Sequence, residues 1–393
     1  MPRIADALER ESRTVDLERG DFERLLGRRE RKQRNRRIGG GAVGVIVALV
    51  MGIIFVRSLT SGRVPADPPV QPRPAPAPAP AGTLAYVLDG DVFVADADGS
   101  NAVKIADGRP AGDCYEWSGE YWAEGPMWSP DGRYLAYRRY TACGNEDGPD
   151  PRDVVISDAE GTVLAAFPTG TGWDIGWSPD STRIAVWDDF GSMIGIYGLD
   201  GVRQTQLTIP PGMKECGDCD PVWMPEGTSL MVPNVEVPLD GGTPRRLPLP
   251  SRAWSPTYSP DGSAVAYLHH RSLTVARSDG SEPRQVFRDW AGSPTWSPTG
   301  DRIAFTTSGL GPAWGSAELR VLEVATGSVT LLTEGERGTY LSVIGFSPQG
   351  DRILFSRTED RGTGESSLWS MGVDGSDARV VVAGTGWGDW LSR

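Results

Sequence analysis

The sequence predicts an all-β fold, a seven-bladed β-propeller with four-stranded blades, preceded by one transmembrane helix. Three observations lead to this prediction. A long uncharged stretch stands near the N-terminus, and acidic-Gly turn signals recur through the rest of the chain. An aromatic residue followed by Ser-Pro, or by a close variant, begins at Trp128, Trp177, Trp223, Tyr258, Trp296 and Phe346.

Each aromatic motif has the composition of a β-hairpin. In the copy that continues from Trp128, Pro130 suits the second position of a type I turn and Gly132 suits a left-handed closing position. An apolar run follows each turn, as expected of a strand that is covered on both faces. The motifs are spaced by about 35 to 50 residues, close to the length of one propeller blade.

The acidic-Gly turn signal lies later in most blades than the aromatic motif and is typical of tight hairpins. We assign its aspartates to turn chemistry rather than to calcium binding, because no loop offers a full set of oxygen ligands. The turns begin at Asp98, Glu160, Asp200, Asp240, Asp279 and Asp374.

Residues 83–393 are expected to form the propeller, closed by a strand from its far end. The first three strands, near residues 84–88, 92–95 and 102–105, have no aromatic motif before them. The missing inner strand is expected at residues 386–391, so that both ends of the domain share one blade. Six complete blades and the shared blade make seven. One blade is expected to be thin, because Pro233 and Pro238 bracket a very short third strand. Counts of six and of eight blades therefore stay as alternatives.

The repeated Ser-Pro-Asp-Gly phrases resemble the propeller of TolB and the WD-repeat-like families that share such turns. The resemblance covers about residues 83–391 and implies the propeller fold. It implies no particular function, because these propellers have many roles. The chain lacks the small α/β domain that precedes the TolB propeller and the hydrolase domain of prolyl-oligopeptidase-type proteins.

Before the propeller we expect three segments. Residues 1–37 form a charged cytoplasmic tail, and residues 38–56 form a transmembrane helix long enough for a ~30 Å hydrocarbon core. Residues 57–82 form a Pro/Ala-rich spacer with polyproline II character. Basic residues crowd the N-terminal side of the helix, so the propeller is expected outside the cytoplasm, at the cell membrane.

The helix and the tail each suggest a further role. Small residues fall on one face of the helix, either as a homodimer contact or as residues simply tolerated in lipid; they are Gly40, Gly44, Ala48 and Gly52. The tail vaguely resembles the inner tails of bacterial membrane proteins that partner sigma factors, although it lacks the His and Cys residues of a zinc-type domain. Transmembrane signalling through a bound regulator is therefore an alternative function.

Composition limits the chemistry. The net charge is −13 and the tail is basic, so the propeller is strongly acidic and nucleic acid is not an expected partner. The chain has two histidines, His269 and His270, expected at an exposed hairpin. We find no catalytic triad, phosphate loop, paired-carboxylate motif or metal-ligand set, and we predict no cofactor and no enzyme activity. A lyase or hydrolase acting on envelope glycans is the alternative.

One face of the propeller is expected to carry the binding site. The tight turns lie on one face, and the long segments lie on the other, where binding loops usually gather. The long segments are about residues 106–125, 138–152, 210–220, 306–317, 334–341 and 356–366. All four cysteines map to the long-segment face, and in an oxidising compartment we expect disulfides. Cys216 and Cys219 are close enough to bridge locally, which leaves Cys114 and Cys143 as the second pair.

The segment after Cys114 is rich in aromatic residues, which either bind a ligand or pack over the rim as structure. They are Tyr115, Trp117, Tyr121 and Trp122. We take these four as the candidate binding face. The predicted function is a membrane-anchored, non-catalytic scaffold whose propeller binds an extracytoplasmic protein or another envelope component.

Overall fold

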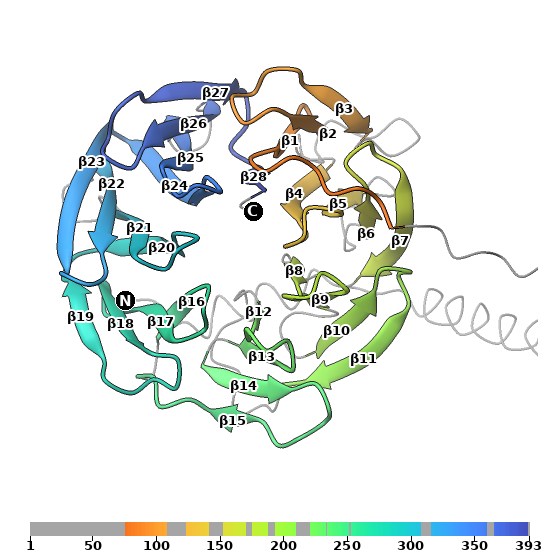
Figure 1. The fold of residues 1–393 in the computed structure, drawn as a ribbon, viewed down its shortest axis with the longest axis horizontal. Coiled ribbons are helices and arrows are strands. Elements are labelled where there is room, and N and C mark those ends of the chain that lie inside the picture. The colour runs from red at the N-terminus through yellow and green to blue at the C-terminus, as the bar shows by residue number, and fades with distance from the viewer. Residues whose placement is uncertain are drawn as a thin grey trace, which may run out of the picture. The chain divides into compact units, whose positions relative to one another are not determined.

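The computed structural model confirms the predicted all-β fold, a ring of seven four-stranded antiparallel sheets (Figure 1). The described residues belong to one compact unit, Pro74–Arg393. They are residues 75–107, 123–140, 152–169, 175–187, 193–209, 221–232, 234–250, 253–307, 316–359 and 365–391.

The blades are numbered from the N-terminus, and the strands of each are given from the inner to the outer edge. Blade 1 contains β28 (Gly388–Trp390), β1 (Leu84–Leu88), β2 (Asp91–Ala95) and β3 (Val103–Ala106). Blade 2 contains β4 (Ala123–Trp128), β5 (Leu135–Tyr140), β6 (Arg152–Ser157) and β7 (Val163–Thr169). Blade 3 contains β8 (Ile175–Trp177), β9 (Arg183–Trp187), β10 (Met193–Gly198) and β11 (Arg203–Thr208). Blade 4 contains β12 (Val222–Trp223), β13 (Ser229–Val232), β14 (Val235–Pro238) and β15 (Arg245–Arg246).

The remaining blades have the same order. Blade 5 contains β16 (Trp254–Tyr258), β17 (Ala264–His269), β18 (Ser272–Arg277) and β19 (Arg284–Phe287). Blade 6 contains β20 (Ala291–Trp296), β21 (Arg302–Thr307), β22 (Ser316–Glu323) and β23 (Ser328–Arg337). Blade 7 contains β24 (Thr339–Phe346), β25 (Arg352–Glu359), β26 (Ser366–Gly372) and β27 (Arg379–Ala383).

The shared blade is confirmed, and with it the count of seven. Strand β28 pairs antiparallel with β1, with Leu84 opposite Trp390 and Tyr86 opposite Gly388. The thin blade 4 is complete, although its inner and outer strands have two residues each. One expected long segment, residues 334–341, is instead almost all strand: β23 continues to Arg337 and β24 begins at Thr339. Gly338 makes this short connection with φ of +94°.

The core lies between neighbouring blades. On β9, Ile184 and Val186 pack into the cluster shared with blade 2, whereas Ala185 and Trp187 pack into the cluster shared with blade 4. Successive side chains of a strand point to opposite sheet faces, so an apolar run is buried on both sides. This explains why the middle strands lack the alternation of a half-exposed sheet.

The aromatic motifs hold the ring together at its inner edge. The indole N–H of Trp177 donates to the carbonyl oxygen of Met127 in the preceding blade, at 3.0 Å. Trp223 donates in the same way to Gly176, at 2.8 Å, and Trp296 to Thr257, at 3.0 Å. We call this contact the indole bond; it joins each of these inner strands to the one before it.

The serine and aspartate of the motif build the turn itself. Ser129 Oγ donates to Asp131 Oδ1 at 2.7 Å and accepts from the backbone N–H of Tyr134 at 3.0 Å. Ser129 is fully buried, so its hydroxyl satisfies backbone groups that water does not reach. The same arrangement recurs around Ser178 and Ser259. Around Ser297 and Ser347 the serine bonds are alike, but the accepting aspartate lies four residues on, at Asp301 and Asp351.

Candidate functional site

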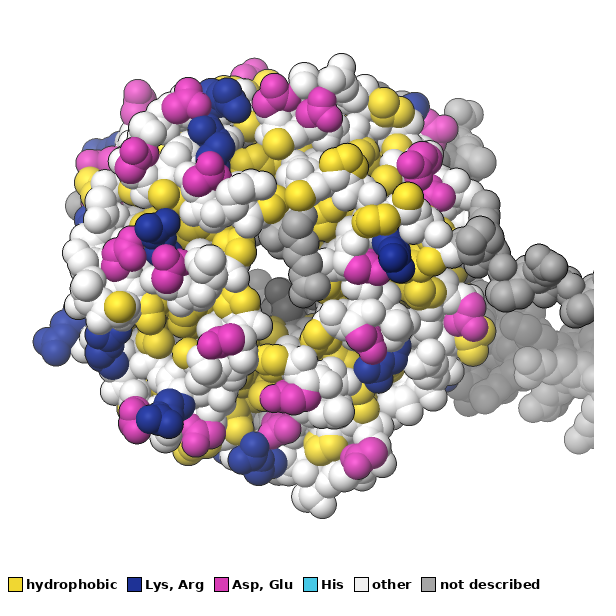
Figure 2. All heavy atoms as spheres, viewed as in Figure 1, with side chains coloured by type: hydrophobic (Ala, Val, Ile, Leu, Met, Phe, Trp, Pro, Cys, Tyr) yellow, Lys and Arg dark blue, Asp and Glu magenta, His cyan; other side chains and the backbone are white. Residues whose placement is uncertain are grey.

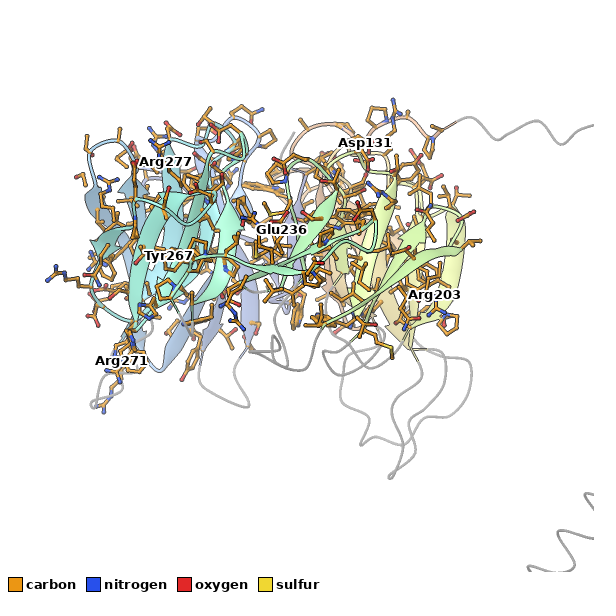
Figure 3. The ribbon with its side chains drawn as sticks, turned by 90° about the horizontal axis from the view of Figure 1, so that it is seen from below. Asp131, Arg203, Glu236, Tyr267, Arg271 and Arg277 are labelled. Atoms are coloured by element: carbon orange, nitrogen blue, oxygen red, sulfur yellow. The ribbon has the colours of Figure 1, made fainter. Side chains whose placement is uncertain are left out.

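The two faces of the ring differ in how their connections are made. The aromatic-motif turns and the acidic-Gly turns lie on one face, which we call the short-turn face. The opposite face, where inner strands begin, is the long-loop face. Figure 3 places Asp131 and Arg277 at the short-turn face and Arg271 at the long-loop face. On the short-turn face, acidic and basic side chains are interspersed without a patch of either sign (Figure 2).

The turn aspartates are occupied within their own turns. Asp98 accepts from the backbone N–H of Ser100 at 3.0 Å, and Asp374 accepts from that of Ser376 at 2.9 Å. Hydrogen bonds from Ser100 and Ser376 hold the pKa of these two carboxyls below their usual range. Across the described ranges, no group of three or more His, Cys, Asp or Glu residues is placed to hold a metal ion.

Most residues of the predicted site lie outside the described residues. These are the candidate binding aromatics Tyr115, Trp117, Tyr121 and Trp122 and the cysteines Cys114, Cys143, Cys216 and Cys219. The predicted membrane span, with Gly40, Gly44, Ala48 and Gly52, is also outside them. Within the part of the chain that is described, we find no helix long and apolar enough to cross a bilayer. The segment with the four aromatics joins β3 to β4, whose facing ends lie on the long-loop face.

The two histidines lie at a tight hairpin on the long-loop face, as predicted. His269 ends β17 and pairs with Ser272, while His270 and Arg271 form the exposed turn. Both turn residues have positive φ, 47° and 71°, which side chains other than glycine rarely adopt. The guanidinium of Arg271 lies 3.7 Å from the centre of the Trp290 ring, and its carbonyl oxygen accepts from the N–H of Ala291. These contacts fix the turn.

Two exposed tryptophans stand where inner strands begin on the long-loop face. Trp254 is 46% exposed and Trp387 is 52% exposed. Trp254 precedes a bulge at which Ser255 has φ of 48° and the pairing of β16 with β17 shifts register. Bulges re-aim side chains, and large exposed aromatic side chains mark binding surfaces. Neither tryptophan was predicted as a binding residue from the sequence. For Trp254 a signal was present in Pro256, because a proline in an inner strand requires irregular pairing.

The end of the spacer is part of the short-turn face. The N–H of Ala79 donates to the carbonyl oxygen of Gly132 at 2.8 Å, and the N–H of Gly82 donates to that of Leu391 at 2.9 Å. Thr83 Oγ1 donates to the carbonyl oxygen of Pro80 at 2.6 Å. Figure 1 shows this segment crossing over blade 2 before it enters β1. The chain therefore reaches the ring from the face opposite Trp254 and Trp387.

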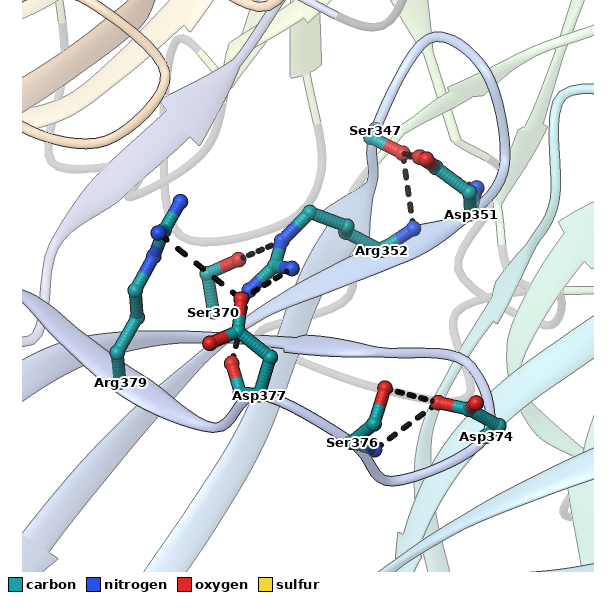
Figure 4. A network of polar contacts seen from close by, with 8 residues as sticks. All are labelled: Ser347, Asp351, Arg352, Ser370, Asp374, Ser376, Asp377 and Arg379. Atoms are coloured by element: carbon teal, nitrogen blue, oxygen red, sulfur yellow. Dashed lines mark hydrogen bonds and ion pairs between the residues drawn. The ribbon is translucent and has the colours of Figure 1, made fainter.

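A cavity of about 380 Å³ opens on the short-turn face between blades 7 and 1. Its walls include Gly82, Asp98, Asp351, Arg379 and Trp390. Beside it, Arg352 donates to Ser370 Oγ at 2.8 Å and to Asp377 Oδ2 at 2.9 Å (Figure 4). The charged groups are largely engaged with one another, so this network holds the blade 7 turns in place.

A partly buried carboxyl lies at the ring closure. Asp389, on β28, accepts a hydrogen bond at Oδ2 from the backbone N–H of Trp128, at 2.8 Å. Burial raises the pKa of Asp389 to about 7, although the N–H groups of Trp128 and Trp390 favour the ionised form. This carboxyl lies on the contact between β28 and β4, so it can stabilise or loosen that contact according to its charge.

Comparison with known proteins supports the fold. No protein-family model and no curated protein matches the sequence. Among solved structures, the chain is similar to a putative TolB from Agrobacterium tumefaciens, at 18% identity over 77% of this chain and 90% of that one, with a TM-score of 0.43. It is also similar to an oligogalacturonate lyase in complex with manganese, at 16% identity over 78% and 85% of the two chains, with a TM-score of 0.51.

A third neighbour is the Swd1 β-propeller domain from Myceliophteria thermophila, at 14% identity over 66% of this chain and 86% of that one, with a TM-score of 0.47. At these identities the likeness concerns the fold alone, and the neighbours include an enzyme and proteins whose names describe no catalysis. The strand order makes this chain a seven-bladed β-propeller, as the motifs predicted.

Proposed function

We propose that this chain is a single-pass membrane protein whose extracytoplasmic propeller is a non-catalytic scaffold. Its long-loop face binds a protein or another component of the cell envelope. One observation carries the proposal: the spacer joins the ring on the short-turn face, while Trp254 and Trp387 are exposed on the opposite face. A tether on one side leaves the other side free to meet a partner.

The two faces also differ in the side chains that they offer. On the short-turn face, the motif serines are buried and the turn aspartates accept hydrogen bonds from their own turns. Trp254 and Trp387 have large apolar surfaces that remain accessible. Tryptophan is enriched among the residues that dominate binding energies. The aromatics predicted from the sequence, Tyr115 to Trp122, would extend the same face because β3 and β4 flank their segment.

The test uses a photo-crosslinking amino acid at position 254 or 387, in the full chain in intact cells. The matched controls carry it at Val103 or Val163, which are 61% and 47% exposed on outer strands. We expect both tryptophan positions to capture the same partner and the controls not to capture it. Alanine at Trp254 and Trp387 should then weaken binding of the purified partner by roughly 10-fold or more, with unchanged melting. Capture from the outer strands alone would contradict the proposal.

A further inference from the structure

The joint between blades 1 and 2, where the ring closes, is built differently from the three joints that carry an indole bond. Trp177, Trp223 and Trp296 each make an indole bond to the preceding inner strand. Trp128 and Trp390 occupy the equivalent places on either side of the closure, yet the Nε1 atoms of both are buried without a hydrogen-bond partner among the described residues. The closure therefore lacks the bond that fastens those three joints.

The closure instead uses a turn assembled from the two ends of the domain. In blade 2, the N–H of Ser129 donates to the carbonyl oxygen of Tyr134, and the N–H of Gly132 donates back to that of Ser129. In blade 1, the N–H of Leu391 donates to the carbonyl oxygen of Thr83 at 3.0 Å, and the N–H of Gly82 donates back to that of Leu391. Gly82 has φ of 83°, comparable to 70° at Gly132. The same turn is thus made without a covalent link across it.

The spacer supplies half of this assembled turn. Gly82 is its last residue, Thr83 follows directly before β1, and Ala79 extends the attachment to blade 2 through Gly132. The side chain of Leu391 occupies the space that a Cβ on Gly132 would enter, at 2.6 Å. The spacer, the closing strand and the blade 2 turn are therefore in mutual contact at one place.

We propose that residues 75–83 form a strap that latches the ring, so that docking of the strap and closure of blade 1 are one cooperative event. A strap pulled away from the ring would take Gly82 from Leu391 and Ala79 from Gly132. Strand β28 would then be left with its three paired positions with β1 and its Asp389 contact with β4, and we expect these contacts to open together with the strap. This inference goes beyond the proposed function and does not depend on the identity of a partner.

The energetics favour local opening at this joint. The strap is attached by a few neutral hydrogen bonds, each of which adds little net stability, so a small free energy holds it. Strand β1 also pairs with β2 over five positions, which keeps blade 1 folded when the strap leaves. Regions held by few bonds open at lower free energy than the rest of a domain. Opening would also remove Ala81 and Gly82 from the wall of the cavity that Trp390 lines.

The spacer offers a closely matched pair of variants. Ala79→Pro removes the N–H that donates to Gly132, and its neighbours Pro78 and Pro80 already favour the extended conformation that proline needs. Ala77→Pro makes the same change two residues earlier, between Pro76 and Pro78. Ala77 is exposed and precedes the attachment to blade 2. The two variants have equal composition and nearly equal spacer stiffness.

The readout is amide hydrogen exchange in the full chain in detergent micelles. For Ala79→Pro we expect exchange about tenfold faster at Gly82, at Leu391 and at Trp128, whose N–H bonds to Asp389 across the joint. Ser347, in the equivalent turn of blade 7, should be unchanged, and Ala77→Pro should match the parent at all four amides. Gly82→Ala, which strains a positive φ within the strap, should act in the same direction as Ala79→Pro.

Two results would overturn the proposal. If Ala79→Pro speeds exchange at Gly82 but leaves Leu391 and Trp128 unchanged, the strap is a passive attachment. If Ala77→Pro has the same effect as Ala79→Pro, general stiffening of the spacer is the cause, and docking is not.

Discussion

The backbone N–H of Gly82 donates a hydrogen bond to the carbonyl oxygen of Leu391, at 2.9 Å, and so joins the two ends of the propeller. The bond completes a turn that the other blades make within one continuous segment containing the motif proline. Because the chain is not continuous here, the stability of this turn depends on packing around it. Trp390 and Leu391, both buried, provide that packing.

Two tryptophans on either side of Gly388 should differ sharply in their effect on stability. Trp390 is 4% exposed and lies in the core between blades 7 and 1, whereas Trp387 is 52% exposed. Trp390→Ala should lower the free energy of unfolding by about 3–5 kcal/mol. Trp387→Ala should change it by about 0.5 kcal/mol or less. Thermal or urea unfolding of the two variants tests this, and equal losses would contradict the assigned register of β28.

The contribution of the indole bond can be isolated by comparing two tryptophan-to-phenylalanine variants. Trp177→Phe removes the hydrogen bond from the indole N–H to the carbonyl oxygen of Met127. Trp128→Phe loses similar volume but removes an N–H that has no partner among the described residues. Trp177→Phe should therefore destabilise the protein by about 0.5–1.5 kcal/mol more than Trp128→Phe. Denaturant unfolding measures the difference; a larger loss from Trp128→Phe would show that its indole is bonded.

Asp389 should make stability fall as the pH rises from about 4 to about 7. Its folded pKa is raised to about 7, from an ordinary value of 3.8, so the folded state holds a proton that the unfolded state releases in this window. The stabilisation is complete below the unfolded pKa and is lost as the pH approaches the folded one. Because Asp389 is also partly exposed, we expect a loss of about 1–3 kcal/mol rather than the full value for such a shift.

Asp389→Asn should remove this part of the pH dependence while keeping an oxygen that can accept from Trp128. The control is Asp98→Asn. Hydrogen bonds from Ser100 lower the pKa of Asp98, so the contribution of Asp98 to the pH dependence of stability lies at more acidic pH. Unfolding curves at several pH values from 4 to 8 give the comparison. An unchanged slope in Asp389→Asn would show that another group causes the dependence.

Two glycines with similar backbone conformations test the contact between neighbouring turns. Gly262 has φ of 69°, and a Cβ there would lie 2.8 Å from Pro225 Cγ; Gly241 has φ of 80° with nothing within 4 Å. Gly241→Ala carries only the backbone strain, about 1 kcal/mol. Gly262→Ala adds a clash with a rigid ring and should cost at least ~1 kcal/mol more. Equal melting temperatures for the two variants would mean that blades 4 and 5 separate easily.

The sequence by itself determined the repeat, the fold class and the closing strand. Tight turns and inner-strand aromatics are local features, since the residues that make a turn are adjacent in the chain. Thus Ser129, Pro130 and Gly132 were sufficient to predict a hairpin, and the strand around Trp390 was predicted because the first blade lacked one. The expected loop at residues 334–341 was wrong, because Gly338 alone accommodates the connection between two long strands.

Only the tertiary structure decided how the ends of the ring are joined and which side chains remain exposed. Trp254, Trp387 and Trp390 have the same side chain but differ in burial. The difference depends on a bulge at Ser255 and on the register of β28. The bonds of Gly82 and Ala79 join residues from distant parts of the sequence, so no local pattern marks them. Turns follow from short-range backbone preferences, whereas closure and exposure follow from packing between segments that meet only when the whole ring has formed.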